Sequence, residues 1–474
     1  MTFHRSWLSS LLLAAGLLPA TSCRSNDRGP ALQPDEIRVG CDRPAGRIKA
    51  ELGGVSQGGN ADGYLKPPVL AALHDLPVKM VRLEAVTCNN TYTLYDPATG
   101  RYDWRKLDQE IEAIQKSGAT VMLNIFGMPQ WLSKDPEQKL GAWWWAPPRD
   151  EQRWARYVGD MVRHVNHDKH YNIKYWEFWN EPSGGYFFTH WKLGKELFWR
   201  LYEVTARAVK EADPTALVGG FGDNVHYPEH YRDWFEYCRP RQIPIDFLTV
   251  HWYGEWPEAD SWKKPELYQR YAVALNALHA SYYPREVPIF YTEWNLPAES
   301  DSAFSAIQQA AFMGSAFYWL QESPAAGAMF FRVEKYRALG ALLDEQFRPR
   351  APWRIMKLFT QLPAQRVQVQ GVGNGITVLA AREPGRLAVM VSRYDPAPGA
   401  PAVKKTLTLH GHGFTGSCRL SIRRETAASA ASPGPWPPAA PTVLTVAAGQ
   451  PISVPLPLEP YAVAWVEIEG NNAN

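Results

Sequence analysis

Two isolated glutamates, Glu181 and Glu293, have the setting of paired catalytic carboxyl groups in this chain of 474 residues. Each stands at the end of a short hydrophobic and aromatic run, residues 173–179 in the first case and residues 287–292 in the second. Hydrolysis of a glycosidic bond needs such a pair, because one carboxyl group protonates the leaving oxygen while the other attacks the anomeric carbon or activates water. A separation of about 5–5.5 Å would retain the anomeric configuration and about 6.5–9.5 Å would invert it. The sequence leaves that distance open.

The two runs belong to a series of hydrophobic segments that alternate with longer helical patterns between residues 48 and 362. Such alternation is typical of repeated βα units around a parallel sheet, and eight units fit an α/β fold, the (β/α)8 TIM barrel. The ends of the strands of such a barrel face one mouth, which would bring the two glutamates together. The predicted strands are residues 48–54, 78–85, 119–126, 173–179, 216–221, 245–251, 287–292 and 325–331.

The pattern of the sequence changes after residue 362. Short alternating runs separated by Gly, Pro and Asn turns predict an accessory antiparallel β-sandwich over residues 363–474. Residues 427–441, rich in Pro, Ala and Ser, predict a surface loop of that domain. Residues 23–47 form an N-terminal segment that could add an edge strand to the sandwich. The catalytic domain would therefore be the barrel, residues 48–362.

The motifs around the two glutamates resemble clan A of the glycoside hydrolases. The sequence Trp-Asn-Glu-Pro at residues 179–182 is similar to the strand-four motif of that clan, and Thr-Glu-Trp-Asn at residues 292–295 to its strand-seven motif. The resemblance implies that Glu181 is the general acid/base and Glu293 the nucleophile of a retaining O-glycosidase. Residues 52–59 and 121–132, together with the trailing sandwich, resemble glycoside hydrolase family 39. That family groups β-xylosidases with α-L-iduronidases and some exopolysaccharide hydrolases, all of them metal-free.

Other positions match residues that support catalysis in that clan. Arg82, at the end of the second predicted strand, resembles the arginine that holds the nucleophile. His251 and Tyr253 match a His-x-Tyr motif, in which the tyrosine can donate its hydroxyl to Glu293. Asn180 would bind the sugar 2-hydroxyl, an interaction expected to strengthen in the transition state.

These assignments have structural alternatives. An Asn-Glu-Pro sequence by itself often marks the start of a helix. Arg82 could instead close an ion pair with Glu84 or Glu177. His251 could be a hydrogen-bonded residue of the mouth without substrate contact. Because Glu177 shares side-chain parity with Glu181, it would lie one layer further inside the barrel as a buried ion-pair partner.

Aromatic residues are unusually frequent, with 20 Trp and 22 Tyr. Their flat rings fill cores, but they also stack on sugars. Trp131 and Trp144, which follow the third strand, are candidate sugar-stacking walls, with packing of their loop as the alternative. Trp294 and two amides, Asn124 and Asn295, are further candidate substrate contacts. The other tryptophans expected around the carboxylate pair are Trp143, Trp145, Trp176, Trp179, Trp191, Trp252 and Trp256.

Arg332 ends the eighth predicted strand, where many members of the clan have a tryptophan. A cation there could bind a uronate carboxylate bidentately and direct the enzyme to glycans that contain uronic acids. The alternative is an ion pair with Glu334 or another acidic residue of the loop. The sequence does not decide between neutral and acidic sugars, nor the linkage, the anomer, or exo versus endo action.

Charge and composition exclude several classes of partner. Lys and Arg total 50 against 48 Asp and Glu, a net charge of +2, and no basic block marks a nucleic-acid surface. The 12 histidines form no HExxH cluster and no CxxC occurs, so we expect neither a metal nor another cofactor. Three disulfide pairings are open in an oxidising compartment to the four cysteines Cys41, Cys88, Cys238 and Cys418.

Residues 1–22 have the features of a signal peptide, since His4 and Arg5 precede a charge-free hydrophobic stretch that ends in small residues. The end of this stretch resembles a bacterial lipoprotein signal, with Cys23 as the lipidated residue, although ordinary signal peptidase could also cleave there. Either way we expect an exported protein, in the periplasm, anchored to the outer membrane, or extracellular.

A carbohydrate, as an oligosaccharide or polysaccharide, is therefore the expected partner. The alternative to a hydrolase is a glycan-binding lipoprotein that keeps the barrel without catalysis. Loss of one carboxyl group would normally accompany such a change, and both glutamates remain here. The sequence gives no indication of the oligomeric state.

Overall fold

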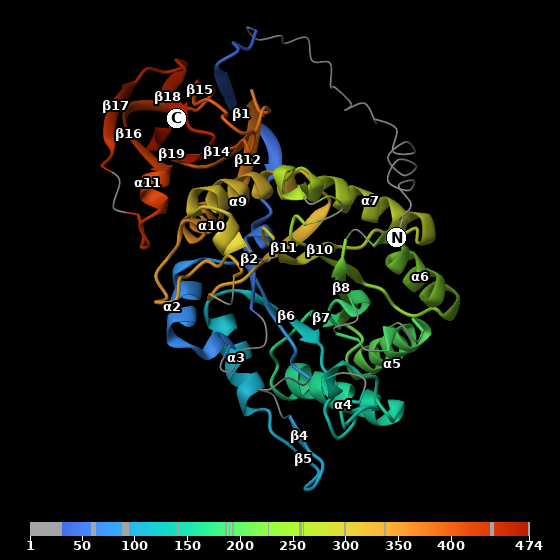
Figure 1. The fold of residues 1–474 in the computed structure, drawn as a ribbon. Coiled ribbons are helices and arrows are strands. Elements are labelled where there is room, and N and C mark those ends of the chain that lie inside the picture. The colour runs from blue at the N-terminus through green and yellow to red at the C-terminus, as the bar shows by residue number, and fades with distance from the viewer. Residues whose placement is uncertain are drawn as a thin grey trace.

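The described residues form a closed barrel, a nine-stranded sheet that packs against it and a small sheet of two strands, β4 (Tyr95–Asp96) and β5 (Arg101–Tyr102) (Figure 1). The computed structural model describes residues 31–57, 63–87, 94–139, 142–184, 187–188, 190–191, 194–225, 227–255, 258, 260–297, 300–335, 338–436 and 440–472. Within these residues the predicted fold class, a (β/α)8 TIM barrel with an accessory β-sandwich, is confirmed. The predicted signal peptide and Cys23 lie outside the described residues.

Eight parallel strands close the barrel. Their hydrophobic side chains are buried on both faces, as expected of a parallel sheet that helices cover. Going around the barrel, the strands are β10 (Ile289–Trp294), β11 (Ala325–Phe331), β2 (Gly54–Gln57), β3 (Met80–Leu83), β6 (Thr120–Ile125), β7 (Tyr175–Phe178), β8 (Leu217–Asn224) and β9 (Phe247–Trp252).

The prediction for the first barrel strand was wrong. Residues 48–54 were expected to form it, but residues Ala50–Gly53 form a 3-10 turn and β2 begins only at Gly54. A Cβ atom at Gly54 would lie 2.8 Å from the carbonyl oxygen of Ala328 in the neighbouring strand, so β2 enters the barrel where only a glycine fits. The strand therefore carries Ser56 and Gln57 to the mouth.

A ring of helices surrounds the strands (Figure 1). Most are amphipathic and bury one side on the barrel, whereas α9 is buried almost all round because the second sheet packs on its outer side. The helices that follow the eight strands are α2 (Pro67–Asp75), α3 (Arg105–Lys116), α4 (Glu151–Arg163), α5 (Glu196–Ala212), α6 (Pro228–Cys238), α7 (Leu267–Tyr282), α9 (Ala306–Gln321) and α10 (Ala351–Thr360).

The second sheet is antiparallel except at one pair, and it has its own hydrophobic core. Its first strand, β1 (Glu36–Arg47), lies between β12 and β15, antiparallel to the former and parallel to the latter. The expected edge strand is thus an interior strand, because both of its edges are paired. In order, the other strands are β17 (Thr442–Val446), β16 (Phe414–Glu425), β19 (Tyr461–Asn472), β14 (Arg386–Tyr394), β13 (Ile376–Glu383), β12 (Gln365–Gln370) and, beyond β1, β15 (Val403–His410) and β18 (Ile452–Leu458).

The predicted surface loop at residues 427–441 contains a short helix, α11 (Ala427–Ala430), and is tied to the barrel. Arg354 of α10 forms a buried ion pair with Glu425, 2.7 Å, and donates to the carbonyl oxygens of Ser429, Ser432 and Gly434. Since a buried guanidinium is costly to leave unpaired, these bonds hold the two parts of the chain together.

Three of the four cysteines considered for disulfides are unpaired and buried: Cys41, Cys238 and Cys418. Cys88 lies outside the described residues. Among the residues described, no helix has the length and hydrophobicity needed to cross a bilayer.

Candidate active site

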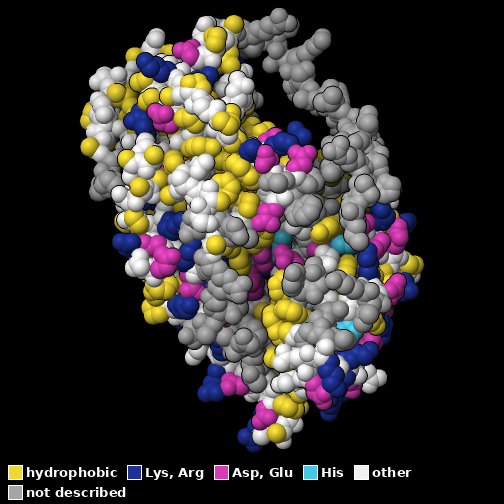
Figure 2. All heavy atoms as spheres, viewed as in Figure 1, with side chains coloured by type: hydrophobic (Ala, Val, Ile, Leu, Met, Phe, Trp, Pro, Cys, Tyr) yellow, Lys and Arg dark blue, Asp and Glu magenta, His cyan; other side chains and the backbone are white. Residues whose placement is uncertain are grey.

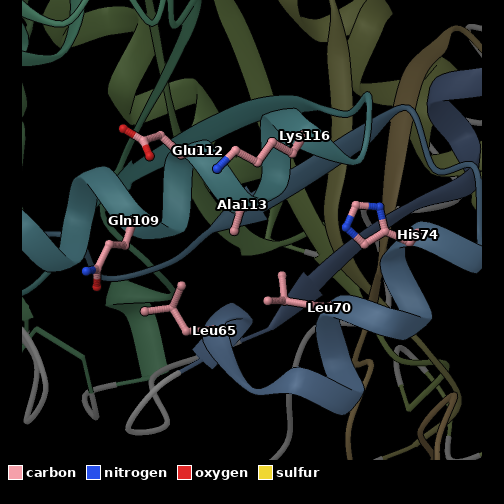
Figure 3. A pocket seen from close by; sticks show the side chains of 7 residues that line it. All are labelled: Leu65, Leu70, His74, Gln109, Glu112, Ala113 and Lys116. Carbon is pink, nitrogen blue, oxygen red and sulfur yellow. The ribbon is translucent and has the colours of Figure 1, made fainter.

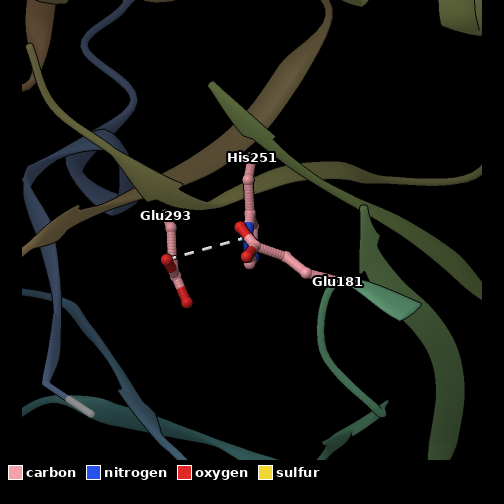
Figure 4. A group of neighbouring side chains, drawn as sticks. All are labelled: Glu181, His251 and Glu293. Atoms are coloured by element: carbon pink, nitrogen blue, oxygen red, sulfur yellow. Dashed lines mark hydrogen bonds and ion pairs between the residues drawn. The ribbon is translucent and has the colours of Figure 1, made fainter. Parts of the chain in front are cut away.

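Glu181 and Glu293 face each other at the mouth of the barrel (Figure 4). Glu293 lies in β10, and Glu181 follows the end of β7. A carboxylate oxygen of each, together with a ring nitrogen of His251, lies within 4.8 Å of the others. Only 9% of the Glu293 side chain is exposed, against 31% for Glu181, so one carboxyl group is sunk in the floor and the other borders open space.

The position of Glu293 depends on an irregularity of β10. The pairing of β10 with β9 shifts register between Tyr291 and Glu293. Such a bulge re-aims the side chain that follows it. Glu293 is thereby directed into the mouth, while Trp294 points to the helices.

Arg82 holds the floor of the site. Its side chain is fully buried, and Nη1 donates to Glu293 Oε1 at 2.8 Å, as the resemblance implied. The alternative partners are present as well, since Nε donates to Glu177 at 2.5 Å and Nη1 also reaches Glu84 at 2.9 Å. Burial by itself would lower the pKa of Arg82, but the three carboxylates raise it, so the guanidinium remains a fixed positive charge beside Glu293. Glu177 is the inner-layer ion-pair partner that its parity predicted.

Tyr253 is a second donor to Glu293. Its hydroxyl donates to Glu293 Oε2 at 2.5 Å, the contact expected from the His-x-Tyr motif. Burial and the adjacent Glu293 raise the pKa of Tyr253 well above 10, so the phenol keeps its proton. Glu293 thus has one oxygen held by a guanidinium and the other by a hydroxyl.

His251 lies between the two carboxyl groups. Its Nδ1 is 2.7 Å from Glu181 and 3.7 Å from Glu293, and its Nε2 is 3.2 Å from the Thr292 hydroxyl. The ring is fully buried. Burial alone would lower the pKa of His251, but the negative charge of Glu293 and the contacts with Glu181 outweigh it and raise the pKa.

The backbone that carries Glu181 adopts an unusual conformation. Trp179 has a φ of 61° and Glu181 a φ of 38°, both in the left-handed region that non-glycine residues rarely adopt. Hydrogen bonds hold this segment, from the Glu181 amide to the Gly222 carbonyl at 3.1 Å and from the Trp179 indole to the Phe187 carbonyl at 2.7 Å. Between them, Asn180 accepts a hydrogen bond from Arg82 at 2.8 Å. Such local strain typically accompanies functional sites.

Two amides predicted as candidate substrate contacts are instead structural. Asn124 is fully buried, and its amide group donates to Glu177 at 2.9 Å and to the Trp179 carbonyl, while its oxygen accepts from the Ala85 amide. Asn295 donates to the carbonyls of Phe331 and Gly340 at 2.7 Å each. Because both amide hydrogens of each side chain are used within the fold, neither has one left for a sugar.

The expected wall of tryptophans is largely wrong. Trp294 is fully buried and packs edge-on against Phe317 and Phe330 on the outer side of the barrel. Neighbouring residues of a strand point to opposite faces, so the residue after Glu293 must face the helices. Trp256 lies outside the described residues. Buried in the same way, on the core side rather than in the cleft, are Trp176, Trp179, Trp191 and Trp252.

The loop after β6 keeps partly exposed rings. Trp131 contacts Tyr95, with ring centroids 4.9 Å apart, and Trp144 contacts Trp145 at 5.1 Å. The packing of the loop thus uses part of each ring and leaves part accessible. A role of Trp131 and Trp144 in stacking on a sugar stays a prediction.

Arg332 forms the ion pair with Glu334 that was the alternative to binding a uronate. Only 1% of the residue is exposed, and Nη2 donates to Glu334 at 2.8 Å. Lys66 reaches the same carboxylate at 2.8 Å. A uronate would have to compete with Glu334 for both cations, which corrects the expectation of an arginine open to the substrate.

Glu84, expected from the sequence only as an ion-pair partner of Arg82, also lies at the mouth of the barrel. It follows β3 and shares the parity of Arg82, and Ser56 of β2 donates a hydrogen bond to it. The parity of Arg82 and Glu84 is visible in the sequence and could have assigned Glu84 to the mouth. Ser56 could not be found, because the strand that carries it was predicted too early in the chain.

The group of Glu181, His251 and Glu293 has the donor types of a metal site but not its electrostatics. Arg82 lies 2.8 Å from Glu293 and would repel a cation. Tyr253 and His251 already occupy other lone pairs of the two carboxylates. The arrangement therefore fits proton transfer and nucleophilic attack better than metal binding.

The molecular surface is consistent with a central site. Figure 2 shows acidic side chains in a hollow near the middle of the face that Figure 1 presents. A separate groove of about 290 Å³ lies on the outer layer between α2 and α3, lined by residues such as His74, Glu112 and Lys116 (Figure 3). It contains none of the residues of the mouth.

Most of the barrel matches a known family of proteins. Residues 70–327, more than half of the chain, match the family model of glycosyl hydrolases family 39. A β-xylosidase of Geobacillus stearothermophilus is 24% identical over 213 residues, which are 41% of each chain. A β-xylosidase of Caldicellulosiruptor saccharolyticus is 30% identical over 184 residues, 35% of each chain. The aligned part thus spans less than half the length of these curated relatives.

The fold is shared more widely than the sequence. The crystal structure of a family 39 enzyme from Xanthomonas axonopodis pv. citri superimposes with a TM-score of 0.75 at 18% identity, covering 96% of this chain and all of the other. At that identity the likeness concerns the fold, sandwich included. The match of the family model is the stronger result, and by it the chain belongs to glycosyl hydrolases family 39.

Proposed function

We propose that the protein is a retaining glycoside hydrolase that acts through a covalent glycosyl-enzyme intermediate. The observation that carries this proposal is the facing pair Glu181 and Glu293, with oxygens within 4.8 Å of each other. Carboxyl groups about 5–5.5 Å apart leave no room for a water between sugar and base, so the second group itself attacks.

The contacts of the two glutamates support a distinct role for each. Glu293, sunk in the floor and held by Arg82 and Tyr253, attacks the anomeric carbon, while Glu181 gives a proton to the leaving oxygen. Once the leaving group has departed, Glu181 takes a proton from water, which attacks the same carbon and releases Glu293. Arg82 orients Asn180 beside the sugar at the same time, through its 2.8 Å bond.

The charges of the mouth favour a neutral sugar, such as a β-xyloside. The positive charge of Arg332 is matched by Glu334 at 2.8 Å, so it is not available to a uronate without rearrangement. Two of the curated relatives are named β-xylosidases, which agrees with this preference, and a third is named an α-1,4-L-rhamnosidase. Uronides and exopolysaccharides are the alternative substrates. Turnover of aryl β-xylosides should exceed that of the matching aryl uronides, and the opposite order would overturn the preference.

Removal of the nucleophile tests the reaction itself. We expect Glu293→Gly to abolish hydrolysis of an aryl glycoside and azide to restore release of the phenol, with a glycosyl azide of inverted configuration as product. Glu181→Ala should lower kcat/KM by about 10²–10⁴-fold for poor leaving groups and much less for an activated one. Glu286→Gln, an exposed carboxyl group in the turn before β10, is the control.

Two results would contradict the proposal. Unaltered turnover in Glu293→Gly would remove Glu293 from its role. Binding of oligosaccharides by the wild type without hydrolysis of any of them would favour the alternative, a glycan-binding lipoprotein without catalysis.

We further propose that the protein is exported and anchored through Cys23. The support is the hydrophobic leader at residues 1–22 and the small residues that precede the cysteine. Cys23→Ala should release the protein from the membrane fraction of the producing cell. A soluble wild type would refute the anchor.

A further inference from the structure

A third carboxyl group, that of Glu84, opens into the mouth beside the proposed nucleophile. Its Oε1 accepts hydrogen bonds from the Ser56 hydroxyl and from Arg82 Nη1 at 2.9 Å. Throughout the described part of the chain, no donor reaches its second oxygen, Oε2, and this atom is not sealed from solvent either. The side chain is 11% exposed, whereas that of Arg82 beneath it is fully buried. Glu84 thus presents one unused acceptor to the cleft.

Glu84 and Glu293 share one atom as donor. Nη1 of Arg82 lies 2.9 Å from Glu84 and 2.8 Å from Glu293. With Glu177 on Nε, three carboxyl groups surround a single guanidinium. Burial and the negative charge of Glu293 raise the pKa of Glu84 above its ordinary value of 4.5, against the effect of Arg82. Because Oε2 is open to the cleft, it can accept a hydrogen bond from a ligand, and hydrogen bonds to a charged carboxylate are among the stronger ones.

The sugar ring has to lie on the side of Glu84. Glu181 must contact the bond to the leaving group, so the leaving group extends over β7 and the loops next to it. The ring of the glycone, the sugar whose anomeric carbon is attacked, then extends from Glu293 toward the opposite strands, β11, β2 and β3. Glu84 and Ser56 stand at the ends of these strands, and Arg332 next to them is occupied by Glu334.

We infer that Glu84 binds a ring hydroxyl of the glycone through Oε2. Because Glu84 and Glu293 share Nη1 of Arg82 as donor, this contact also fixes the position of the sugar relative to Glu293. This inference rests on the proposed hydrolase function and adds a specificity-determining residue to it. The sugar hydroxyl donates to Oε2, which accepts no hydrogen bond from any residue that the structure describes. A glycone that places a carboxylate at this position would be repelled by Glu84, so the same contact selects neutral sugars.

The inference can be tested with an aryl β-xyloside and its three monodeoxy analogues. Hydrogen bonds to a charged group contribute about 1.5–3 kcal/mol, so Glu84→Ala should lower kcat/KM for the parent xyloside by about 10- to 150-fold. For one of the deoxy analogues, the one that lacks the bound hydroxyl, the loss should nearly vanish, because the partner of Glu84 is missing already. Glu84→Gln keeps the shape of the side chain and should show the same selectivity to a smaller degree.

Two controls separate binding from indirect effects. Ser56→Ala removes one bond to Glu84 but leaves Oε2 in place, so its loss should be small and equal for all four substrates. Glu286→Gln reports on an exposed carboxyl group. Equal losses of the Glu84 variants on all four substrates would overturn the inference and leave Glu84 as a support of Arg82 only.

The outcome remains distinguishable from a failure of the proposed function. If the wild type hydrolysed no glycoside, calorimetric titration of the wild type and of Glu84→Gln with D-xylose would still report on the contact. We expect at least a tenfold weaker Kd in the variant. An unchanged Kd would refute the contact whatever the reaction of the enzyme.

Discussion

At the scale of single residues, the site balances many negative charges against few positive ones. Glu84, Glu177 and Glu293 share the guanidinium of Arg82, and Glu181 contacts Nδ1 of His251. The ionisation of each group therefore depends on its neighbours, and the protonation of His251 is coupled to that of the carboxyl groups beside it.

The pH dependence of the stability of the folded protein should report on the protonation of His251. The pKa of His251 is raised above its ordinary value of 6.5, so its ion pairs contribute fully below about that value and are lost as the pH rises through the folded-state pKa. We expect the difference in Tm between the wild type and His251→Gln to be largest near pH 6 and to shrink toward pH 9. Thermal unfolding followed by circular dichroism measures it.

Thr292→Val is a matched control for this experiment. It removes the partner of Nε2 but keeps the imidazole between the two glutamates. Its difference from the wild type should vary little with pH. A difference for His251→Gln that grew with pH would show that the ring is held neutral instead.

Sequence patterns predicted the two glutamates and their direct partners better than the positions of the tryptophans and the roles of the amides. Glu181, Glu293, Arg82 and Tyr253 occur in motifs whose spacing along alternating βα units already places them at one mouth. Trp294 was misjudged because it is adjacent in sequence to Glu293, although adjacent strand residues point to opposite faces. The network that uses up the amides of Asn124 and Asn295 depends on segments far apart in sequence, so no local pattern reports it.

At the scale of elements, α9 joins the two parts of the molecule. It follows β10, which carries Glu293, and its outer face packs on β13, β14 and β19 of the second sheet. Gly314 lies at that contact, and a Cβ atom there would be 2.1 Å from the hydroxyl oxygen and 3.0 Å from the Cβ of Ser392 in β14. A glycine inside a helix thus allows the sheet to approach closely.

Gly314→Ala should therefore destabilise the protein by about 1–3 kcal/mol, because the extra methyl group overpacks the contact. Urea unfolding measures this change. Gly159→Ala in α4 is the control, since its Cβ would meet only the end of the Arg163 side chain. That exchange should be neutral or stabilise the helix by up to about 1 kcal/mol. Equal effects at both positions would mean that helix propensity, and not the contact with the sheet, determines the result.

The positions of most strands, like those of the charged site residues, could be predicted from local sequence patterns. Seven barrel strands began within two residues of their predicted ranges, since each is a hydrophobic run bounded by turns. The first strand was misplaced because Ile48, Ala50 and Leu52 alternate with polar residues as in a strand, although residues Ala50–Gly53 form a 3-10 turn. The strand begins at Gly54, which neighbouring backbone crowds. The interior position of β1 could not be derived from its own residues, because strand order is a property of the whole sheet.

At the scale of the whole molecule, the second sheet contains both ends of the described chain. β1 precedes the barrel, and β12 to β19 follow it. Within β1, Glu36 receives hydrogen bonds from Arg38 at 2.7 Å and from Thr408 of β15 at 2.6 Å. Burial alone would raise the pKa of Glu36, but these bonds, with one from the Gln33 amide, lower it to about 2.

This carboxyl group should contribute to acid stability. A depressed pKa stabilises the fold above the unfolded-state value, near 4.5, and the contribution is lost as the pH falls toward about 2. Glu36→Gln should cost roughly 2 kcal/mol at pH 7, with the cost declining below pH 4.5. Urea unfolding at pH 3, 5 and 7 measures it, with Glu345→Gln as an exposed control. A cost that did not change with pH would assign the effect of Glu36 to packing instead.

The place of β1 also sets the order in which the protein can be completed during synthesis. The ribosome makes β1 first, yet its two neighbours, β12 and β15, appear only after the entire barrel. The barrel can close early, but β1 must wait with both edges unpaired, which exposes a strand to wrong partners. A gene cut at residue 363 would for the same reason yield a C-terminal fragment without β1, the strand that joins β12 to β15. The barrel and the second sheet are separate parts of the structure, but the second sheet is not contiguous in the chain, so the two cannot be synthesised one after the other.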